Sequence, residues 1–328
     1  MKKIIVTGGH GFIGSTLIKE LLKNKNYKVL NLDSNTYASN PNSLKLIKSN
    51  PKYKFSKINI CHPKIKKIIT SFKPNAIFHL AAESHVDNSI LKADNFIKSN
   101  INGTFHLLKI CNDYLNKNNI NDFRFIHVST DEVYGSKSLK SGKSKETDRY
   151  EPNSPYSASK AASDHLVRAW FKTYNFPAII THSSNNYGPW QNDEKFIPVI
   201  IKSLIKRNFI PIYGKGKNIR NWIYVQDHAN ALISIYKKGI LGETYNIGTT
   251  VELSNIELVN KICNIFNKKF PNNKPYQSLI SFVKDRPGHD MRYSLNTDKL
   301  RKKIKFKIKT NFTSGLLQTI NWYISNYK

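Results

Sequence analysis

The chain has 328 residues, 39% of them hydrophobic and 12% aromatic, which excludes an intrinsically disordered protein and fits one large or two ordinary domains. No apolar run approaches the ~18 residues of a membrane span, so we expect no membrane contact. The three cysteines are scattered, which excludes a disulfide framework and a zinc site and predicts a cytoplasmic protein. The net charge is +30, which by itself would suggest a nucleic-acid partner. Only eight of the 52 basic residues are Arg, however, and the Lys residues are spread along the whole chain. The charge therefore indicates a solvated Lys-rich surface and no nucleic-acid partner.

Short apolar runs alternate with helical patterns along the first half of the chain. The opening stretch MKKIIVTGG has too short an apolar run for a signal peptide, and we interpret it as the first strand. Continuous apolar strands that alternate with helices are typical of a parallel sheet covered on both faces. The pattern predicts an α/β protein with a doubly wound (Rossmann) parallel sheet, with strands over residues 2–8, 28–33, 53–60, 75–82, 123–130 and 177–184 and helices over 13–24, 63–72, 93–117 and 154–175.

The alternation becomes irregular after residue 185. Proline at positions 198, 211 and 287 and the turn-like stretches YGKGKN and DRPGHD indicate a smaller, more irregular C-terminal lobe. A helix over 221–238 and a strand over 243–248 are predicted to return to the main sheet. We therefore expect a Rossmann domain over residues 1–184, joined by residues 220–248, and a second lobe over residues 185–328.

The stretch TGGHGFIG places Gly8, Gly11 and Gly14 three residues apart, between the first strand and the first helix. Such glycines allow a tight turn, a close approach of the backbone to a pyrophosphate, and close packing of helix on strand. Asp33 ends the second strand, where its carboxylate would accept a hydrogen bond from a ribose hydroxyl and would repel a 2′-phosphate. The pattern predicts NAD in preference to NADP; an ordinary glycine-rich turn with a capping aspartate is the alternative.

The stretch SPYSASK places Tyr156 and Lys160 four residues apart, on one face of a helix that Ser154 can cap and Pro155 can begin. The reference pKa of tyrosine is about 10, but a neighbouring Lys⁺ and an oxidised nicotinamide both favour the phenolate and lower that pKa. The pair therefore predicts a base that takes a proton from an alcohol as hydride leaves its carbon. A tyrosine packed on a helix with its lysine in solvent is the alternative.

The strand over 123–130 ends in Thr130 and is followed by two carboxylates, Asp131 and Glu132. Ligands of doubly wound sheets bind beyond the carboxyl ends of the strands, so these residues are predicted to meet the substrate. Oxidation of an alcohol needs only Tyr156 and NAD. Two further acids indicate a second proton-transfer event, in which one removes a proton next to the new ketone and the other protonates a departing hydroxyl. The doublet predicts an elimination of water, unless the acids only cap the following turn.

Several stretches together resemble one enzyme family. The glycine interval is similar to that of the extended short-chain dehydrogenase/reductase superfamily. The stretches STDEVYG, LAAESHVD, SPYSASKAASDHLVRAW, SNNYGP, IRNWIYV and DRPGHDMRY resemble the dTDP-glucose 4,6-dehydratase family, from the first strand to at least residue 293. Related epimerases and decarboxylases of nucleotide sugars typically lack the Asp-Glu doublet, and GDP-mannose dehydratases carry a Ser before the Glu and prefer NADP. The doublet and Asp33 are therefore the discriminating features.

The resemblance implies a hydro-lyase that acts on dTDP-glucose and retains its NAD. Tyr156 would take the proton of the sugar 4-hydroxyl, to which Thr130 hydrogen-bonds, as hydride moves from carbon 4 to NAD⁺. Glu132 would then remove the carbon 5 proton while Asp131 protonates the departing 6-hydroxyl. The hydride would return to carbon 6 and a proton to carbon 5. The expected product is dTDP-4-keto-6-deoxy-glucose.

The resemblance also assigns binding residues, position by position. The catalytic residues would be Thr130, Asp131, Glu132, Tyr156 and Lys160. The cofactor contacts would come from Gly8, Gly11, Phe12, Ile13, Gly14, Asp33, Ser34, Asn35, Thr36, Asn59, Ile60, Leu80, Ala81, Ala82, Glu83, Ser84, Ser99, Tyr156, Lys160 and Asn186. The nucleotide sugar would meet Ser84, Thr130, Asn185, Lys195, Phe196, Pro211, Ile212, Tyr213, Arg220, Asn255, Asp285, Arg286, Pro287, Gly288 and His289. Arg220 and Arg286 are scarce arginines whose planar forks suit a diphosphate, and surface ion pairing is the alternative.

The chain departs from the family pattern at Asn59, where an aspartate commonly contacts the adenine amino group, and at Asn88, where an arginine is usual. The Asn59 amide oxygen can still accept a hydrogen bond, so we expect the adenine to be bound more weakly but not lost. Because family members are homodimers, the resemblance implies a homodimer formed through residues 93–117 and 155–175. Two other classes remain open: an epimerase or decarboxylase of the same superfamily, and a non-catalytic relative that binds nucleic acid through its positive charge.

Overall fold

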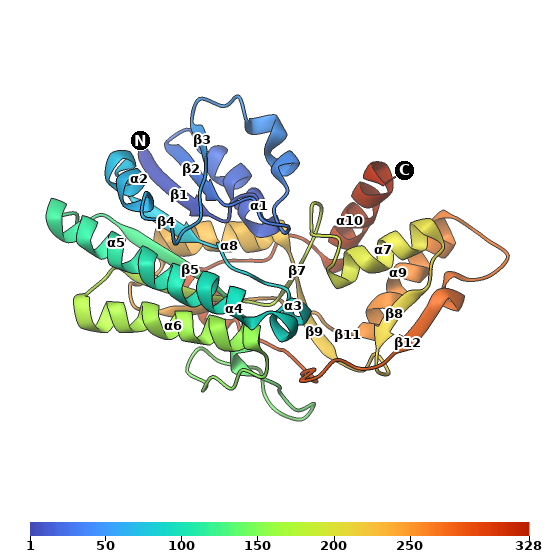
Figure 1. The fold of residues 1–328 in the computed structure, drawn as a ribbon. Coiled ribbons are helices and arrows are strands. Elements are labelled where there is room, and N and C mark those ends of the chain that lie inside the picture. The colour runs from blue at the N-terminus through green and yellow to red at the C-terminus, as the bar shows by residue number, and fades with distance from the viewer. Residues whose placement is uncertain (328) are drawn as a thin grey trace.

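The computed structural model describes residues 1–327. At its centre lies a seven-stranded sheet in which every neighbouring pair of strands is parallel (Figure 1). The strand order β10-β6-β5-β4-β1-β2-β3 changes direction between β1 and β4, the kind of place where doubly wound sheets bind ligands. The predicted fold class is confirmed, with the strands β1 (Lys2–Thr7), β2 (Tyr27–Asp33), β3 (Tyr53–Lys57), β4 (Ala76–His79), β5 (Arg124–Thr130), β6 (Ala178–Ser183) and β10 (Thr244–Ile247).

Helices cover both faces of this sheet because successive side chains of a strand point to opposite faces. Ile4 and Val6 of β1 belong to one apolar core together with α1 (Phe12–Leu22) and α8 (Val225–Lys238), and Ile5 belongs to the opposite core. That second core is completed by α2 (Ile65–Phe72), α5 (Gly103–Asn118) and α6 (Pro155–Tyr174), of which α5 and α6 lie side by side in Figure 1. Burial on both faces explains why the strands are continuously apolar.

The second lobe has its own apolar core and two small sheets. One sheet has the order β11-β9-β7, and the other pairs β12 with β8. In Figure 1 most of these elements lie together at the end of the molecule away from the main sheet. The elements are β7 (Asn185–Tyr187), α7 (Phe196–Lys206), β8 (Ile210–Tyr213), β9 (Ile219–Tyr224), β11 (Glu252–Ser254), α9 (Asn255–Lys269), β12 (Ile280–Val283) and α10 (Phe312–Asn326).

Several element boundaries differ from the sequence-based predictions. The segment 221–238 is not one helix: its first four residues belong to β9, which pairs with β7 and β11, and the helix α8 begins at Val225. The predicted helix over 93–117 consists of α4 (Ala93–Phe96), a π-helical segment over Ile97–Asn102, and α5, and it is preceded by α3 (Val86–Leu91). The predicted strands over 53–60 and 75–82 end earlier, at Lys57 and His79, and give way to loops. Short 3₁₀-helical segments also occur at Pro41–Ile47, Asp131–Tyr134 and Tyr276–Leu279, and a π-helical segment occurs at Leu300–Ile304.

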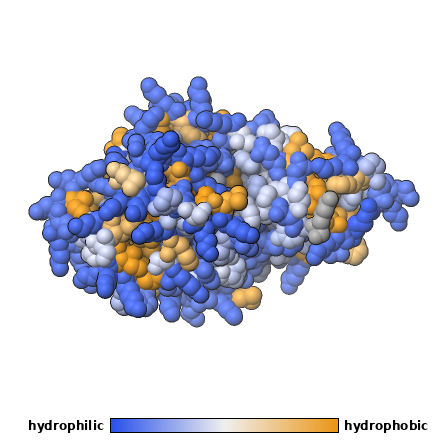
Figure 2. All heavy atoms as spheres, turned by 90° about the horizontal axis from the view of Figure 1, so that it is seen from above, coloured by the Kyte–Doolittle hydropathy of each residue, from blue (hydrophilic) through white to orange (hydrophobic). Residues whose placement is uncertain are grey.

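The helix and strand predicted to return to the main sheet do so. The strand β10 pairs with β6 at the sheet edge, and α8 packs against α1. The division of the chain into residues 1–184 and 185–328 stays a prediction. The face seen in Figure 2 is largely hydrophilic, with hydrophobic side chains in separate patches. Among the residues that the structure describes, no helix has the length and apolarity required to cross a membrane.

Candidate active site

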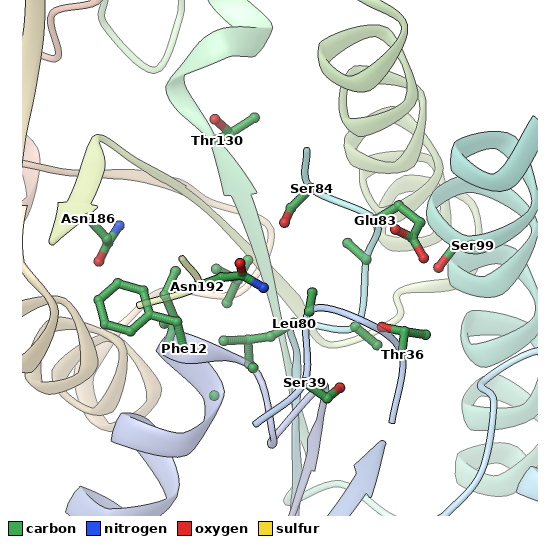
Figure 3. A pocket seen from close by; sticks show the side chains of 18 of the residues that line it. Phe12, Thr36, Ser39, Leu80, Glu83, Ser84, Ser99, Thr130, Asn186 and Asn192 are labelled. Carbon is green, nitrogen blue, oxygen red and sulfur yellow. The ribbon is translucent and has the colours of Figure 1, made fainter. Parts of the chain in front are cut away.

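A cavity of about 300 Å³ opens beyond the carboxyl ends of the central strands. It is lined by residues that follow β1, β2, β4, β5 and β6, where a doubly wound sheet is expected to bind its ligand. Figure 3 shows Phe12 at the start of α1, Leu80 after β4 and Thr130 at the end of β5 around this space. The place of the cavity follows from the topology, because parallel strands end at one common edge.

The glycine-rich turn between β1 and α1 forms one wall of the cavity. Gly8 has a φ of +70°, and a Cβ atom there would lie 2.8 Å from the backbone nitrogen of Ala81. A Cβ on Gly14 would lie only 2.2 Å from the carbonyl oxygen of Gly8. Gly11 precedes α1 without a side-chain cap, so the first N–H groups of the helix lack a side-chain acceptor. Free N–H groups at a helix N-terminus form a binding place for a phosphate.

Asp33, at the end of β2, is held in place by three hydrogen bonds. Its Oδ2 accepts from the backbone N–H of His10 at 2.9 Å, and its Oδ1 accepts from the backbone N–H of Asn35 and the hydroxyl of Ser39, both at 2.7 Å. A carboxylate has about four acceptor positions, so Asp33 can still accept from a ribose hydroxyl. The Asn35 side chain does not line the cavity; its Oδ1 lies 2.6 Å from Nδ1 of His10.

The other predicted cofactor residues all line this cavity. Asn59 is among them, although its side-chain oxygen already accepts from the backbone N–H of Cys61 at 2.8 Å, which leaves one acceptor position for an adenine. Sequence reasoning missed further lining residues: Ser129 and Ser184 open the recognised stretches STDEVYG and SNNYGP, and the path of the chain brings the others to the wall. The missed residues are Leu32, Ala38, Ser39, Ile58, Val128, Ser129, Ser183, Ser184, Gln191, Asn192 and Glu194.

The helix α6 presents Tyr156 and Lys160 to the cavity. Its N-terminus is a capping box: the hydroxyl of Ser154 accepts from the backbone N–H of Ser157, the Ser157 hydroxyl accepts in return, and Pro155 occupies the first turn. This arrangement starts the helix directly before Tyr156, as the sequence predicted. Both side chains are buried, and Lys160 donates to the carbonyl oxygen of Val128 at 2.9 Å, so the lysine does not lie in solvent.

Burial changes the protonation of both groups. It lowers the pKa of Lys160 to about 8, with the Asp164 carboxylate partly opposing it. Burial and the Glu132 carboxylate together raise the pKa of Tyr156, while the Thr130 side chain lowers it to a smaller extent. This direction differs from the sequence-based expectation, which considered Lys160 and an oxidised nicotinamide but neither burial nor Glu132.

The acid pair forms the first turn after β5. Thr130 caps this turn: its hydroxyl oxygen accepts from the backbone N–H of Glu132 at 3.3 Å, so the acids are not the capping groups. The Asp131 side chain is buried, and its Oδ2 has no hydrogen-bond partner among the described residues. Burial and the neighbouring Glu132 raise the pKa of Asp131 well above its ordinary value.

Glu132 is in a different electrostatic environment. Burial raises the pKa of Glu132 above its ordinary value, although the positive charges of Arg220, Arg286 and Lys195 partly oppose this. Asp131 is therefore the carboxyl that more readily holds a proton, and Glu132 is the one that more readily releases it. Two adjacent carboxyls with different environments can act as an acid and a base in the same step.

A second cavity, of about 320 Å³, lies between Glu132 and the second lobe. The two cavities share Ser84, Glu132, Asn185, Glu194 and Lys195, so they meet at Glu132. Three cations, Lys195, Arg220 and Arg286, line the second cavity. Lys195 donates to the carbonyl oxygen of Ser84 at 2.9 Å, and Arg286 lies 3.5 Å from Asp87. Converging cations of this kind suit a diphosphate.

Most predicted substrate residues line one of the two cavities, but Ile212, Asp285, Pro287 and Gly288 do not. Ile212 is in the core of the second lobe because residues alternate along β8: Pro211 and Tyr213 face the cavity side. Asp285 lies 2.6 Å from Nδ1 of His289, which does line the cavity. Sequence reasoning assigned no substrate contact to His85, Val86, Asp87, Glu194, Val199, Trp222, Val283 and Tyr293. Glu194 adjoins the predicted Lys195, and Tyr293 closes the DRPGHDMRY stretch, so both were close to recognised motifs.

Comparisons with known proteins agree along the whole chain. A family model described as GDP-mannose 4,6 dehydratase matches residues 5–319. A dTDP-glucose 4,6-dehydratase of Haemophilus influenzae is 46% identical, with 99% of each chain covered. The crystal structure of dTDP-glucose 4,6-dehydratase from Bacillus anthracis in complex with NAD has a TM-score of 0.89 at 37% identity and covers 99% of this chain and 97% of that chain. The enzyme of the same name from Streptomyces venezuelae, with NAD bound, has a TM-score of 0.89 at 38% identity and the same coverage.

The description of the family model mentions GDP-mannose, whereas the similar full-length relatives act on dTDP-glucose by name. The resemblance noted in the sequence gives two features as typical of the dTDP-glucose group: Asp33, which would repel a 2′-phosphate, and the Asp131–Glu132 doublet at the end of β5. Both are present and both line the first cavity. The chain belongs to the dTDP-glucose 4,6-dehydratase family.

Proposed function

We propose that the protein is an NAD-dependent dTDP-glucose 4,6-dehydratase, a hydro-lyase that forms dTDP-4-keto-6-deoxy-glucose. The observation that carries the proposal is the position of Glu132, beside Asp131, where the two cavities meet. A sugar that reaches from the cationic cavity toward the glycine-rich cavity would pass this acid pair. NAD, when bound, supplies the hydride acceptor for carbon 4 and the hydride donor for carbon 6.

Tyr156 is the proposed base for the 4-hydroxyl of the sugar. Its phenolate must form while burial and Glu132 raise its pKa, so nearby positive charge is needed. Lys160 supplies such a charge: with a pKa of about 8 it is mostly protonated at neutral pH. Its hydrogen bond to the carbonyl oxygen of Val128 fixes the ammonium group next to the end of β5. Thr130, at that strand end, would hydrogen-bond the same hydroxyl.

Asp131 and Glu132 divide the elimination between them. Oxidation at carbon 4 makes the hydrogen on carbon 5 acidic, and Glu132, whose ionised form is favoured by three cations, removes it. Asp131, whose protonated form is favoured by burial, gives its proton to the 6-hydroxyl as that group leaves as water. Both proton-transfer groups lie in the same turn of the chain, directly after β5. An epimerase or decarboxylase needs no such pair, which is why we do not propose those activities.

The second cavity is the proposed site of the nucleotide diphosphate. Arg220, Arg286 and Lys195 would share its negative charge, and the forks of the two arginines can each contact two oxygens. Tyr213 and Pro211, on the exposed face of β8, would border the base. The identity of the base as thymine follows from the family and not from these contacts.

We further propose a homodimer through the paired helices α5 and α6. Phe105 and Tyr174, on these helices, are 44% and 53% exposed, and Ile97 in the preceding π-helical segment is 47% exposed. The rings of Phe105 and Trp170 pack edge to face, with their centroids 5.7 Å apart. The indole nitrogen of Trp170 has no hydrogen-bond partner among the described residues. Substitution of Phe105 by Asp should give a monomer in light scattering, whereas the same change at Leu46, which is 96% exposed on another element, should not.

A cytoplasmic location is proposed from the three free cysteines, Cys61, Cys111 and Cys263. The chain division is also a proposal: residues 1–184 with residues 220–248 as the NAD-binding unit, and the rest of 185–328 as the nucleotide-sugar lobe. The return of β10 and α8 to the main sheet supports it, and the β9 strand at 219–224 argues that the returning part begins at Val225.

The decisive experiment incubates the purified protein with dTDP-glucose and no added cofactor. We expect the ultraviolet absorbance of a 4-keto sugar nucleotide at alkaline pH and the loss of water by mass spectrometry, since a regenerated NAD stays bound. An unchanged mass with a new stereoisomer would point to an epimerase. No conversion of dTDP-, UDP- or GDP-sugars even with added NAD would overturn the enzymatic assignment and favour a binding protein.

A further inference from the structure

We propose that Asp290 is a positioning residue for the dehydration step: it holds the second lobe against the start of the helix α6 and supplies negative charge opposite the cations around Glu132. This inference rests on the proposed function, in which Glu132 is the base. Asp290 follows the residues of the DRPGHD stretch that the family resemblance assigned to the substrate, and it lines neither cavity. Its role would therefore be exerted through other side chains.

Asp290 is the centre of a buried hydrogen-bond cluster. The residue is 6% exposed, its Oδ1 accepts from the side-chain amide of Asn153 at 2.7 Å, and its Oδ2 accepts from the hydroxyl of Tyr293 at 2.5 Å. Its backbone carbonyl oxygen accepts from Arg220 at 3.0 Å and from the Asn218 amide at 3.2 Å. Both oxygens of this buried carboxylate accept a hydrogen bond from a protein side chain, and each donor is thereby oriented.

One side of this cluster reaches the catalytic helix. Asn153 immediately precedes Ser154, the residue that caps α6 two positions before Tyr156. The backbones of the two segments also lie close together: a Cβ atom added to Gly288 would lie 2.9 Å from the carbonyl oxygen of Asn153. The backbone N–H of Met291 also donates to the hydroxyl of Ser136, four residues after Glu132, at 2.9 Å. Gly288 and Asp290 of the DRPGHD stretch and the following Met291 thus contact both segments that carry the proposed proton-transfer groups.

The other side of the cluster reaches the substrate cavity. The Arg220 guanidinium lies 4.3 Å from the centre of the Tyr293 ring, and both side chains line the second cavity beside Glu132. Because the Tyr293 hydroxyl is tied to Asp290, the ring offers Arg220 a fixed face. Arg220 is in turn one of the cations proposed to hold the diphosphate. Asp290 therefore connects the binding of the nucleotide sugar to the position of the acid pair.

The charge of Asp290 acts on the proposed base. Burial raises the pKa of Glu132, three cations lower it, and Asp290 raises it again. A base with a higher pKa removes a carbon-bound proton more effectively, provided that it is still ionised at the working pH. The other titratable groups that influence or are influenced by Glu132 are Asp131, Tyr156, Lys195, Arg220, Arg286 and Tyr293. Within this set Asp290 is a carboxylate outside the reacting pair, so it can be neutralised without removing a proton-transfer group.

The test is the substitution Asp290→Asn, which removes the charge and keeps the size. The amide of Asn153 can turn over, so that its oxygen accepts from the new amide while the new carbonyl oxygen still accepts from Tyr293. We expect the acidic limb of the pH profile of kcat/KM to move to lower pH, because the pKa of Glu132 falls. We also expect reduced cofactor to accumulate during turnover, since oxidation at carbon 4 continues while the weaker base slows the elimination.

The matched control is Asn153→Ala, which removes a hydrogen bond to Asp290 and leaves the charge in place. It should leave the acidic limb unchanged and lower the Tm, because one hydrogen bond to a buried charged group is lost. An unmoved acidic limb in D290N, with an active wild-type enzyme, overturns the inference and leaves the proposed function intact. Absence of any 4-keto product from the wild-type enzyme overturns the proposed function itself. If D290N does not fold, Asp290→Ser removes the same charge without an amide next to Asn153 and gives the same comparison.

Discussion

Asp164 offers a direct test of how the catalytic helix is held against the sheet. It lies one turn after Lys160 on α6 and is buried. Its Oδ1 is 3.1 Å from Nε2 of His127 on β5, and its Oδ2 is 3.0 Å from Nε2 of His182 on β6 and accepts from the Ser129 hydroxyl at 2.9 Å. Burial alone would raise its pKa, but the two neighbouring histidines, His127 and His182, outweigh burial and hold the pKa of Asp164 well below its usual range.

Replacement of Asp164 by Ala leaves the buried polar groups of His127, His182 and Ser129 without their common partner. Each such group costs about 1–3 kcal/mol, and the loss of one partner from a buried charged network costs about 3–5 kcal/mol in total. For a chain of this size about 1.5 °C of Tm corresponds to 1 kcal/mol, so D164A should lower the Tm by about 4–7 °C. Asp164→Asn keeps the shape and one acceptor oxygen, and its cost should be about 1–2 kcal/mol.

The assay is thermal unfolding followed by circular dichroism, at one cofactor concentration throughout, because ligand binding shifts the Tm. Asp122→Ala is the matched control: Asp122 forms an exposed ion pair with Lys2 at 3.3 Å, and its loss should cost less than about 1 kcal/mol. The difference in Tm between wild type and D164A should become smaller at acidic pH. A carboxyl with a lowered pKa stabilises the fold above its unfolded pKa of about 4, and that contribution is lost as pH falls through the folded pKa. A Tm of D164A equal to that of D122A would refute the reasoning.

Three further outcomes are expected. Glu132→Gln should lower the rate of water loss by about 10²–10⁴-fold while single-turnover experiments still show reduced cofactor, and equal loss of both steps would contradict its role as the elimination base. Gly14→Ala should abolish the ordered glycine turn and NAD retention, because a Cβ would lie 2.2 Å from the Gly8 carbonyl oxygen; NAD content by mass spectrometry after native purification checks this. Ile212→Ala should lower stability by about 2–5 kcal/mol through a cavity in the core of the second lobe, whereas Tyr213→Ala, with its side chain partly exposed, should mainly raise KM.

The glycine interval, Asp33 and the Tyr156–Lys160 spacing could be recognised without the fold because each depends on local geometry. A turn that admits only glycine, and a helix that brings residues four apart onto one face, are properties of short segments. The same holds for the sheet, since apolar runs that alternate with helices leave few topologies open. The Asp131–Glu132 doublet was informative for a related reason: charge directly after a buried strand is placed at the ligand-binding edge by the topology itself.

The electrostatics and the lobe contacts depend on residues distant in the chain. No local pattern shows that Glu132 lies among Arg220, Arg286 and Lys195, or that burial and Glu132 raise the pKa of Tyr156. The sequence also does not show which face of a short strand is buried. Ile212 packs inward while its neighbours face the cavity, because the register of β8 is set by its pairing with β12. The start of α8 at Val225 depends likewise on the pairing of β9 with β7 and β11. Local sequence therefore specifies which groups are present and in what spacing, and long-range packing specifies their burial, their neighbours and hence their protonation.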